Sequence, residues 1–75
     1  MARVIWSLDA TRTLVRGRRL VIEGAARVRS QCERIKRLGV AGLDTADAEE
    51  LLGLLEDSQL AMIASLTRRE RQIHP

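Results

Sequence analysis

One short segment, Leu38 to Asp44, divides the chain into two halves, and each half carries apolar residues at helical spacing. Gly39 can adopt the left-handed conformation that ends a helix, and Val40 can pack back on the last turn as in a Schellman motif. Asp44 can accept hydrogen bonds from the free backbone N–H groups at the start of the next helix. The sequence therefore predicts two helices that are joined by a bend at residues 39–44.

The apolar residues of the first half are spaced alternately by four and three positions, which is the pattern of a helical seam that packs on another helix. Arg18 interrupts this pattern, and Gly17 lowers the stability of a helix by about 1 kcal/mol relative to Ala. We therefore expect the first helix to begin either near residue 10 or only at residue 18, and to end at about Leu38. The predicted seam consists of Leu14, Arg18, Val21, Ala25, Val28, Cys32 and Ile35.

Residues 1–9 stand apart from this pattern. Val4, Ile5 and Trp6 could form a short strand, an apolar arm on a partner, or the frayed start of the helix. We treat the segment as an N-terminal arm that is disordered or bound to a partner, and we assign residues 10–75 to the hairpin.

The second half, over about residues 45–73, has an apolar stripe that is too wide for one neighbouring helix. Leu54 and Leu60 lie outside the expected seam, and in a lone hairpin each would forgo roughly 1.5 to 3 kcal/mol of burial. Pairing two hairpins into a four-helix bundle removes that loss. The sequence therefore predicts an all-α antiparallel hairpin that forms a homodimer. Its interface and core are assigned to Val21, Ala25, Val28, Cys32, Ile35, Leu51, Leu52, Leu55, Gln59, Met62 and Leu66.

Gln59 is a polar residue in the middle of this leucine-rich seam. We interpret it as a residue that fixes register or partner number at some cost in stability, in preference to a ligand-binding role. An aspartate at the preceding seam position, Leu55→Asp, would bury a charge and is expected to cost several kcal/mol.

Charge differs strongly between the two halves. Residues 1–38 contain ten Lys or Arg and three acidic residues, whereas residues 39–75 contain three Arg and seven acidic residues, which gives +7 and −4 and the total of +3. Folding at the bend is expected to form exposed ion pairs that contribute only about 0–1 kcal/mol each. The expected pairs join Arg34, Lys36 and Arg37 to Asp47, Glu49 and Glu50, and Arg27 to Glu56.

Seven arginines are expected to meet at the open end of the hairpin, with little acidic charge to offset them. Their neighbours could be solvent with counter-ions, the acidic half of an antiparallel second copy, or a nucleic acid or acidic protein. Guanidinium groups bind phosphates well, but the single aromatic residue, Trp6, provides poorly for base stacking. This candidate anion-binding cluster consists of Arg12, Arg16, Arg18, Arg19, Arg68, Arg69 and Arg71.

Patterns typical of catalysis or metal binding are missing from the sequence. His74, the only histidine, lies beside the C-terminus, and Cys32 is interpreted as a small hydrophobic residue of the seam, not a nucleophile. We therefore expect neither enzymatic activity nor a metal or cofactor. The lone cysteine, the lack of a secretory signal and the lack of an apolar run of about 20 residues favour a cytoplasmic protein with no membrane partner.

A bend of the form Gly-x-Asp-Thr, followed by a leucine-rich helix, lies within the segment from Arg18 to Ile73. The motifs of this segment are Glu23-Gly24, Arg27-Val28, Gln31, Ile35, Leu38, Gly42-Leu43-Asp44-Thr45-Ala46, Ala48-Glu49-Glu50-Leu51-Leu52, Leu55-Glu56 and Arg69. On these residues, about three quarters of the chain resembles a group of short, uncharacterised bacterial helical-hairpin proteins, familiar mainly from alphaproteobacteria. The resemblance implies the hairpin fold and no catalytic residue or cofactor.

Taken together, these features favour a non-enzymatic helical interaction module, an adaptor or regulator that acts through self-association. A nucleic-acid-binding regulator that uses the arginine cluster is the first alternative, and its likeness to small RNA-binding bundles is one of shape alone. A hairpin that docks on a larger protein and covers its leucines there is the second alternative.

Overall fold

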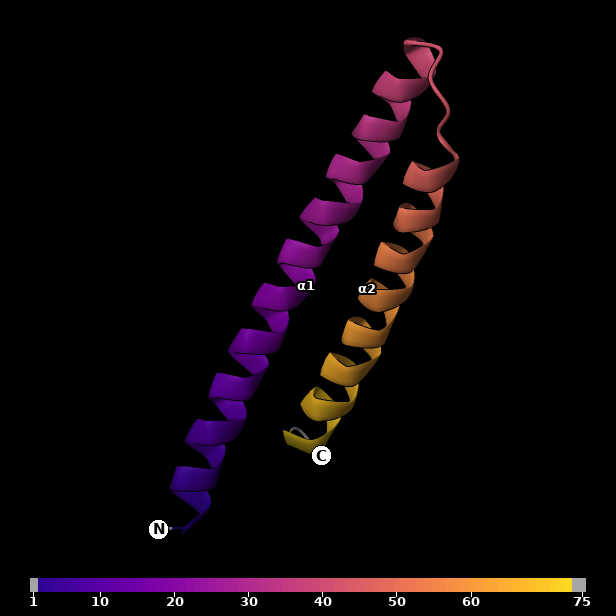
Figure 1. Ribbon diagram of the computed structural model, residues 1–75. Coiled ribbons are helices and arrows are strands. Elements are labelled where there is room, and N and C mark those ends of the chain that lie inside the picture. Colours follow the sequence, from indigo (N-terminus) through magenta and orange to yellow (C-terminus); the bar gives the residue numbers. More distant parts are fainter. Residues whose placement is uncertain (1, 74–75) are drawn as a thin grey trace.

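The computed structural model describes the backbone of residues 2–73 and the side chains of residues 11–72. Two helices run antiparallel and side by side, α1 over Ala2–Val40 and α2 over Ala46–Ile73 (Figure 1). The molecule is a rod that measures 62 × 14 × 14 Å along its principal axes. The predicted all-α antiparallel hairpin is confirmed.

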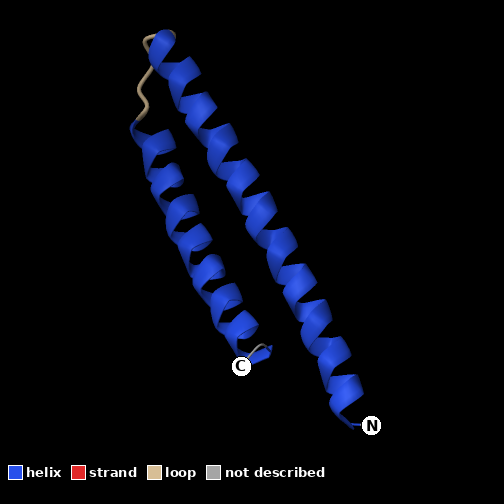
Figure 2. Ribbon diagram, turned by 180° about the vertical axis from the view of Figure 1, so that it is seen from behind, coloured by secondary structure: helices blue, strands red, loops and turns tan. Residues whose placement is uncertain are grey.

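α1 begins earlier than the sequence suggested. It starts at Ala2 instead of residue 10 or 18, and it passes through Gly17 without a break. At 1.5 Å per residue, the 39 residues of α1 give a length of about 58 Å and the 28 residues of α2 give about 42 Å. The first turns of α1, which we expected as a separate arm, therefore continue the helix past the end of α2 (Figures 1 and 2).

The bend closes α1 with a Schellman motif, but at Gly42 and not at Gly39. Leu43 N donates to Leu38 O at 2.9 Å and Gly42 N donates to Gly39 O at 3.0 Å, which are the two hydrogen bonds of that motif. Gly42 has the left-handed conformation, with φ of 73°, whereas Gly39 stays helical. α1 therefore continues two residues beyond the end predicted near Leu38, because the glycine that closes it is Gly42 and not Gly39.

The start of α2 has the cap that the sequence predicted. Asp44 Oδ1 accepts a hydrogen bond from Ala46 N at 2.9 Å. Asp47 and Glu49 place negative charge in the first turn, where it complements the positive end of the helix dipole. The structure thus confirms Asp44 as the residue that caps α2.

Alanine substitutions at the two glycines of the bend are expected to have opposite effects. A Cβ at Gly39 meets nothing within 4 Å, so Gly39→Ala should raise the free energy of unfolding by about 0.5–1 kcal/mol through helix propensity. Gly42→Ala forces alanine into a left-handed conformation and should lower the free energy of unfolding by about 1 kcal/mol. Urea unfolding followed by circular dichroism measures both, and effects of the same sign would contradict the position of the Schellman motif.

The line along which α1 contacts α2 differs from the predicted seam at every second position. Gly24 and Gln31 are buried, whereas Arg18 is exposed and Ala25 and Cys32 are only half-buried. Small residues and a hydrogen-bonded glutamine take the alternate positions because they let the two helices approach closely. The observed line runs through Leu14, Gly17, Val21, Gly24, Val28, Gln31, Ile35 and Leu38.

The core between the two helices is thin. Among the described side chains, Leu14 is the only buried apolar one, with 6% of its surface exposed. The other apolar residues of the contact line are half-buried, because a single neighbouring helix covers only one side of each. The large apolar side chains that stay exposed are Val15, Leu20, Ile22, Val40, Leu43, Leu51, Leu54, Leu60 and Ile63.

Candidate interaction surfaces

Two glutamines join the helices across the contact line, one from each helix. Gln59 Nε2 donates to the backbone oxygen of Val21 at 2.7 Å, and Gln31 Nε2 donates to the backbone oxygen of Ala48 at 2.8 Å. A carbonyl oxygen has two lone pairs, so each of these bonds can form beside the one within the helix. Sliding one helix by a turn would break both bonds, and the two glutamines therefore fix the register of the hairpin.

Gly24 lies beside the side-chain amide of Gln59. A Cβ at residue 24 would overlap Gln59 Oε1 and would lie 3.0 Å from Met62 Cε. Gln59 Oε1 is itself buried and has no hydrogen-bond partner among the described residues. The absence of a side chain at residue 24 therefore makes room for the amide that reaches the backbone of Val21.

One face of the hairpin presents exposed apolar side chains from both helices. A groove of about 400 Å³ lies between the helices on this side, and Ala25 of α1 and Leu60 of α2 line it. Ile22 precedes Ala25 by three residues and Ile63 follows Leu60 by three, so both lie on the same side as the groove. Ile22 and Leu60 are 68% and 67% exposed. We call Ile22, Ala25, Leu60 and Ile63 the isoleucine face.

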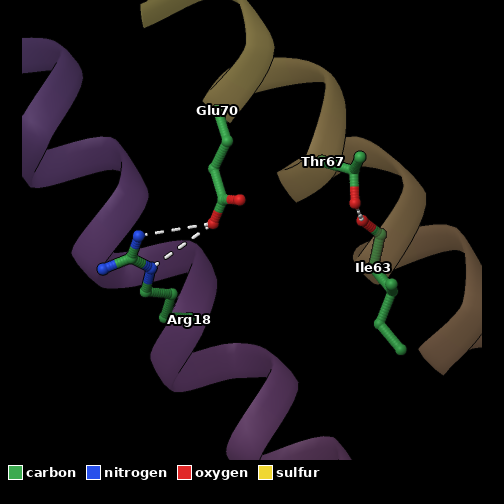
Figure 3. Close-up of polar contacts among 4 residues, drawn as sticks. All are labelled: Arg18, Ile63, Thr67 and Glu70. Atoms are coloured by element: carbon green, nitrogen blue, oxygen red, sulfur yellow. Dashed lines mark hydrogen bonds and ion pairs between the residues drawn. The ribbon is translucent and has the colours of Figure 1, made fainter. Parts of the chain in front are cut away.

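The hydroxyl group next to this face is satisfied within its own helix. Thr67 Oγ1 donates to Ile63 O, four residues earlier, at 2.9 Å (Figure 3). This bond satisfies the hydroxyl group of Thr67 without a partner from outside its own helix.

The other side of the contact line is basic. A groove of about 470 Å³ lies there, and its lining includes Leu55, Ser30 and three arginines. Leu51 precedes Leu55 by one turn and lies on the same side, with 44% of its surface exposed. Leu54 follows Leu51 by three residues and is 62% exposed. We call Arg27, Arg34 and Arg37, which line this groove, the arginine face.

Among the described residues, Arg18 and Glu70 form the only ion pair, with 3.4 Å between Arg18 Nη2 and Glu70 Oε1 (Figure 3). Their side chains are 60% and 39% exposed, so the pair contributes at most about 1 kcal/mol. The expected pair of Arg27 with Glu56 is absent because the two residues line grooves on opposite faces. Pairs expected at the bend are also absent from the described structure: those of Arg34, Lys36 and Arg37 with Asp47, Glu49 and Glu50.

The arginines of the predicted anion-binding cluster lie at the open end of the hairpin. The bond from Arg18 to Glu70 places residues 68–71 of α2 beside residues 12–19 of α1. Apart from Arg18, none of the seven has an ion pair within the part of the chain that the structure describes. They do not converge on one point, because residues two apart, such as Arg16 and Arg18, face opposite sides of a helix.

The predicted interface residues lie on the contact line or beside it. All are half-buried except Leu51, which is exposed. The predicted interface set omits Gly24 and Gln31, because glycine and glutamine carry no hydrophobic signal, although the small residues Gly24 and Ala25 do indicate from the sequence that another helix can approach closely there. The signal that could have found them is their spacing: residues 17, 24 and 31 are seven apart, as a helical seam requires.

The described residues offer no other kind of site. They contain no group of three His, Cys, Asp or Glu residues that could hold a metal ion. Cys32 is a free, half-buried thiol, and His74 lies outside the described residues. Neither helix, over its described length, is apolar enough to cross a lipid bilayer.

No family model, no curated protein and no solved structure matches this chain. The resemblance to bacterial helical-hairpin proteins therefore stays a prediction. The candidate functional surfaces of the hairpin are the isoleucine face, the arginine face and the arginine cluster.

Proposed function

We propose that this chain is a non-enzymatic interaction module, an adaptor or regulator, in which two hairpins associate into a four-helix bundle. The observation that supports this proposal most directly is the exposure of large apolar side chains on both helices, such as Ile22 and Leu60. Each such side chain forgoes roughly 1.5–3 kcal/mol of burial in a lone hairpin. A second hairpin supplies the apolar surface that covers them.

The total accessible surface also supports association. The hairpin exposes 6224 Å². A compact monomer of 8.4 kDa is expected to expose about 4,600 Å², so the excess is roughly 1,600 Å². A standard stable interface buries about 800 Å² on each partner. The excess surface that the hairpin could bury by association is therefore larger than a stable dimer needs.

Molar mass in solution tests the proposal. Light scattering on a sizing column should give a mass of twice 8.4 kDa at both low and moderate salt, because an apolar interface is not weakened by screening. A mass near 8.4 kDa at micromolar concentration would contradict self-association. A poorly folded monomer would favour the second alternative, in which the leucines are covered by a larger protein.

A second candidate function is nucleic-acid binding by the arginine cluster, which is favoured because only Arg18 of its seven arginines has an ion pair among the described residues. Affinity for a short DNA duplex should then fall steeply with salt, with a log–log slope of about −0.9 for each phosphate that is neutralised. A triple variant, Arg12→Gln with Arg16→Gln and Arg19→Gln, should make the slope less steep by about 2 to 3.

The control for this measurement is the double variant Arg34→Gln with Arg37→Gln, which removes positive charge from the other end of α1. Its salt slope should equal that of the wild type if the cluster is the binding site. Equal effects of the two variants, or no binding at low salt, would exclude the cluster as a specific nucleic-acid site.

A further inference from the structure

We propose that a second copy of this chain docks on the isoleucine face, with both hairpins pointing the same way and α1 of each copy lying across α2 of its partner. This inference rests on the self-association proposed above. It adds which face of the hairpin is buried and how the two copies are oriented.

The isoleucine face is the face whose charges can balance those of an identical copy. Arg29 and Glu56 line its groove from opposite helices, and Arg18 is bonded to Glu70 on the same side. Helical spacing extends both edges, which gives three basic residues and one acidic residue on α1, and three acidic residues and one basic residue on α2. These flanking residues are Arg18, Arg29, Glu33, Lys36, Glu49, Glu56, Glu70 and Arg71. Two such faces brought together are therefore neutral and complementary.

The arginine face lacks this balance. Its groove is lined by Arg27, Arg34 and Arg37 and by no acidic residue of the described chain. Helical spacing adds Glu23 and Asp47 to its edges together with Arg16 and Arg69, so the face keeps a net positive charge. Two copies that met there would place like charges against each other, which costs binding free energy and slows encounter. This face is therefore left outside the dimer, although it carries Leu51 and Leu54.

The charge of each helix decides the orientation. Two hairpins packed face to face are related by a twofold axis that is either perpendicular or parallel to the helices. The perpendicular axis lays α1 on α1, and residues 2–40 carry ten basic and three acidic residues, a net charge of +7. The parallel axis lays α1 on α2, where residues 46–73 carry three basic and six acidic residues, a net charge of −3. Summed over the whole helices, electrostatic complementarity therefore favours the parallel axis, although this axis also brings the arginine clusters of the two copies to the same end of the bundle.

The parallel axis also brings specific residues together. Arg29 and Glu56 flank one groove at the same height, so Arg29 of each copy comes over Glu56 of the partner subunit. The apolar side chains of the isoleucine face meet at the centre of this contact. This arrangement replaces the antiparallel placement of a second copy considered from the sequence, which would set α1 against α1.

A matched pair of leucine variants tests the choice of face. Leu60 and Leu54 lie on the same helix and are similarly exposed, 67% and 62%, but they occupy opposite sides of the contact line. Leu60→Glu should raise the dimer dissociation constant by at least about 100-fold, because it buries a charge at the centre of the interface. Leu54→Glu should change the constant by less than about threefold. Sedimentation equilibrium over a range of concentrations measures both.

Cys32 tests the orientation, because it lies seven residues after Ala25 and therefore on the isoleucine face. When the hairpins point the same way, the two thiols stand at the same height on diagonally opposite helices, whose axes are roughly 14 Å apart, and a flexible bismaleimide of that reach joins them. Antiparallel copies would separate the thiols by roughly 20 Å or more along the rod. The control variant Cys32→Ser/Ser30→Cys moves the thiol to the arginine face, where Ser30 lines the groove, and should not cross-link.

The outcomes distinguish this inference from the function on which it rests. A wild-type monomer overturns self-association itself. A wild-type dimer that withstands Leu60→Glu but dissociates with Leu54→Glu overturns the choice of face. A wild-type dimer whose Cys32 thiols react with a monofunctional maleimide but are not cross-linked overturns the shared direction of the hairpins.

Discussion

Replacing Gly24 with leucine is expected to lower the free energy of unfolding by about 3 kcal/mol, which is a large part of the stability of so small a domain. Even a single Cβ at this position would overlap Gln59 Oε1 and approach Met62 Cε to 3.0 Å. A leucine would force the two helices apart and would break the hydrogen bond from Gln59 Nε2 to the backbone of Val21. Urea unfolding at fixed protein concentration, followed by circular dichroism, measures the loss.

Ala26→Leu is the matched control for this variant. Residue 26 is two positions away and exposed, so the same increase in side-chain volume should change the free energy of unfolding by less than about 0.5 kcal/mol. A cycle of Gly24→Ala and Gln59→Ala isolates the contact, because removal of the amide makes room for the new methyl group. The double variant should be more stable than the sum of the single effects by about 1 kcal/mol. Additive effects would contradict the close approach at Gly24.

Val21→Asp is expected to lower the free energy of unfolding by about 2–4 kcal/mol, because it places a charge on the contact line where the structure offers little solvation. Val21 is half-buried, and its own backbone oxygen accepts the bond from Gln59. Two-state urea unfolding gives the change in the free energy of unfolding. This change should be compared with the one that the same substitution causes at another half-buried position of the contact.

Leu55→Asp is that comparison, and its cost should be smaller than the sequence alone suggested. Leu55 lines the groove of the arginine face together with Arg27 and Arg34, so a carboxylate at residue 55 finds cations nearby. An opposite charge within reach offsets part of the desolvation of a buried carboxylate. A cost for Leu55→Asp that equals or exceeds that for Val21→Asp would contradict the position of Leu55 beside the arginines.

The positions of the ion pairs could not be derived from the sequence. The charges of the two halves predicted pairs near the bend and between Arg27 and Glu56, whereas the only pair among the described residues, Arg18 with Glu70, lies at the open end. A pair requires that two residues share a face, and sequence distance from the bend fixes height along the rod but not the face. Arg27 and Glu56 illustrate this point, because they lie on opposite sides of the contact line.

At the bend, too, the sequence determined one feature and the structure decided another. A glycine followed by an apolar residue occurs twice, at Gly39 with Val40 and at Gly42 with Leu43, and each pair can form a Schellman motif. Local sequence therefore determined that the helix would end here and which motif would end it. The choice of Gly42 depends on the short connection to Asp44, whose cap the sequence had predicted correctly.

The sequence by itself determined two helices, their antiparallel arrangement and every second position of their contact, because apolar residues recur there at a period of seven. Val21, Val28 and Ile35 belong both to the predicted seam and to the observed contact line. Only the tertiary structure decided that Gly24 and Gln31, and not Ala25 and Cys32, complete the contact line. The physical reason is the short distance between the helices, which favours a residue without a side chain and a glutamine that bonds to the opposite backbone over a larger apolar surface.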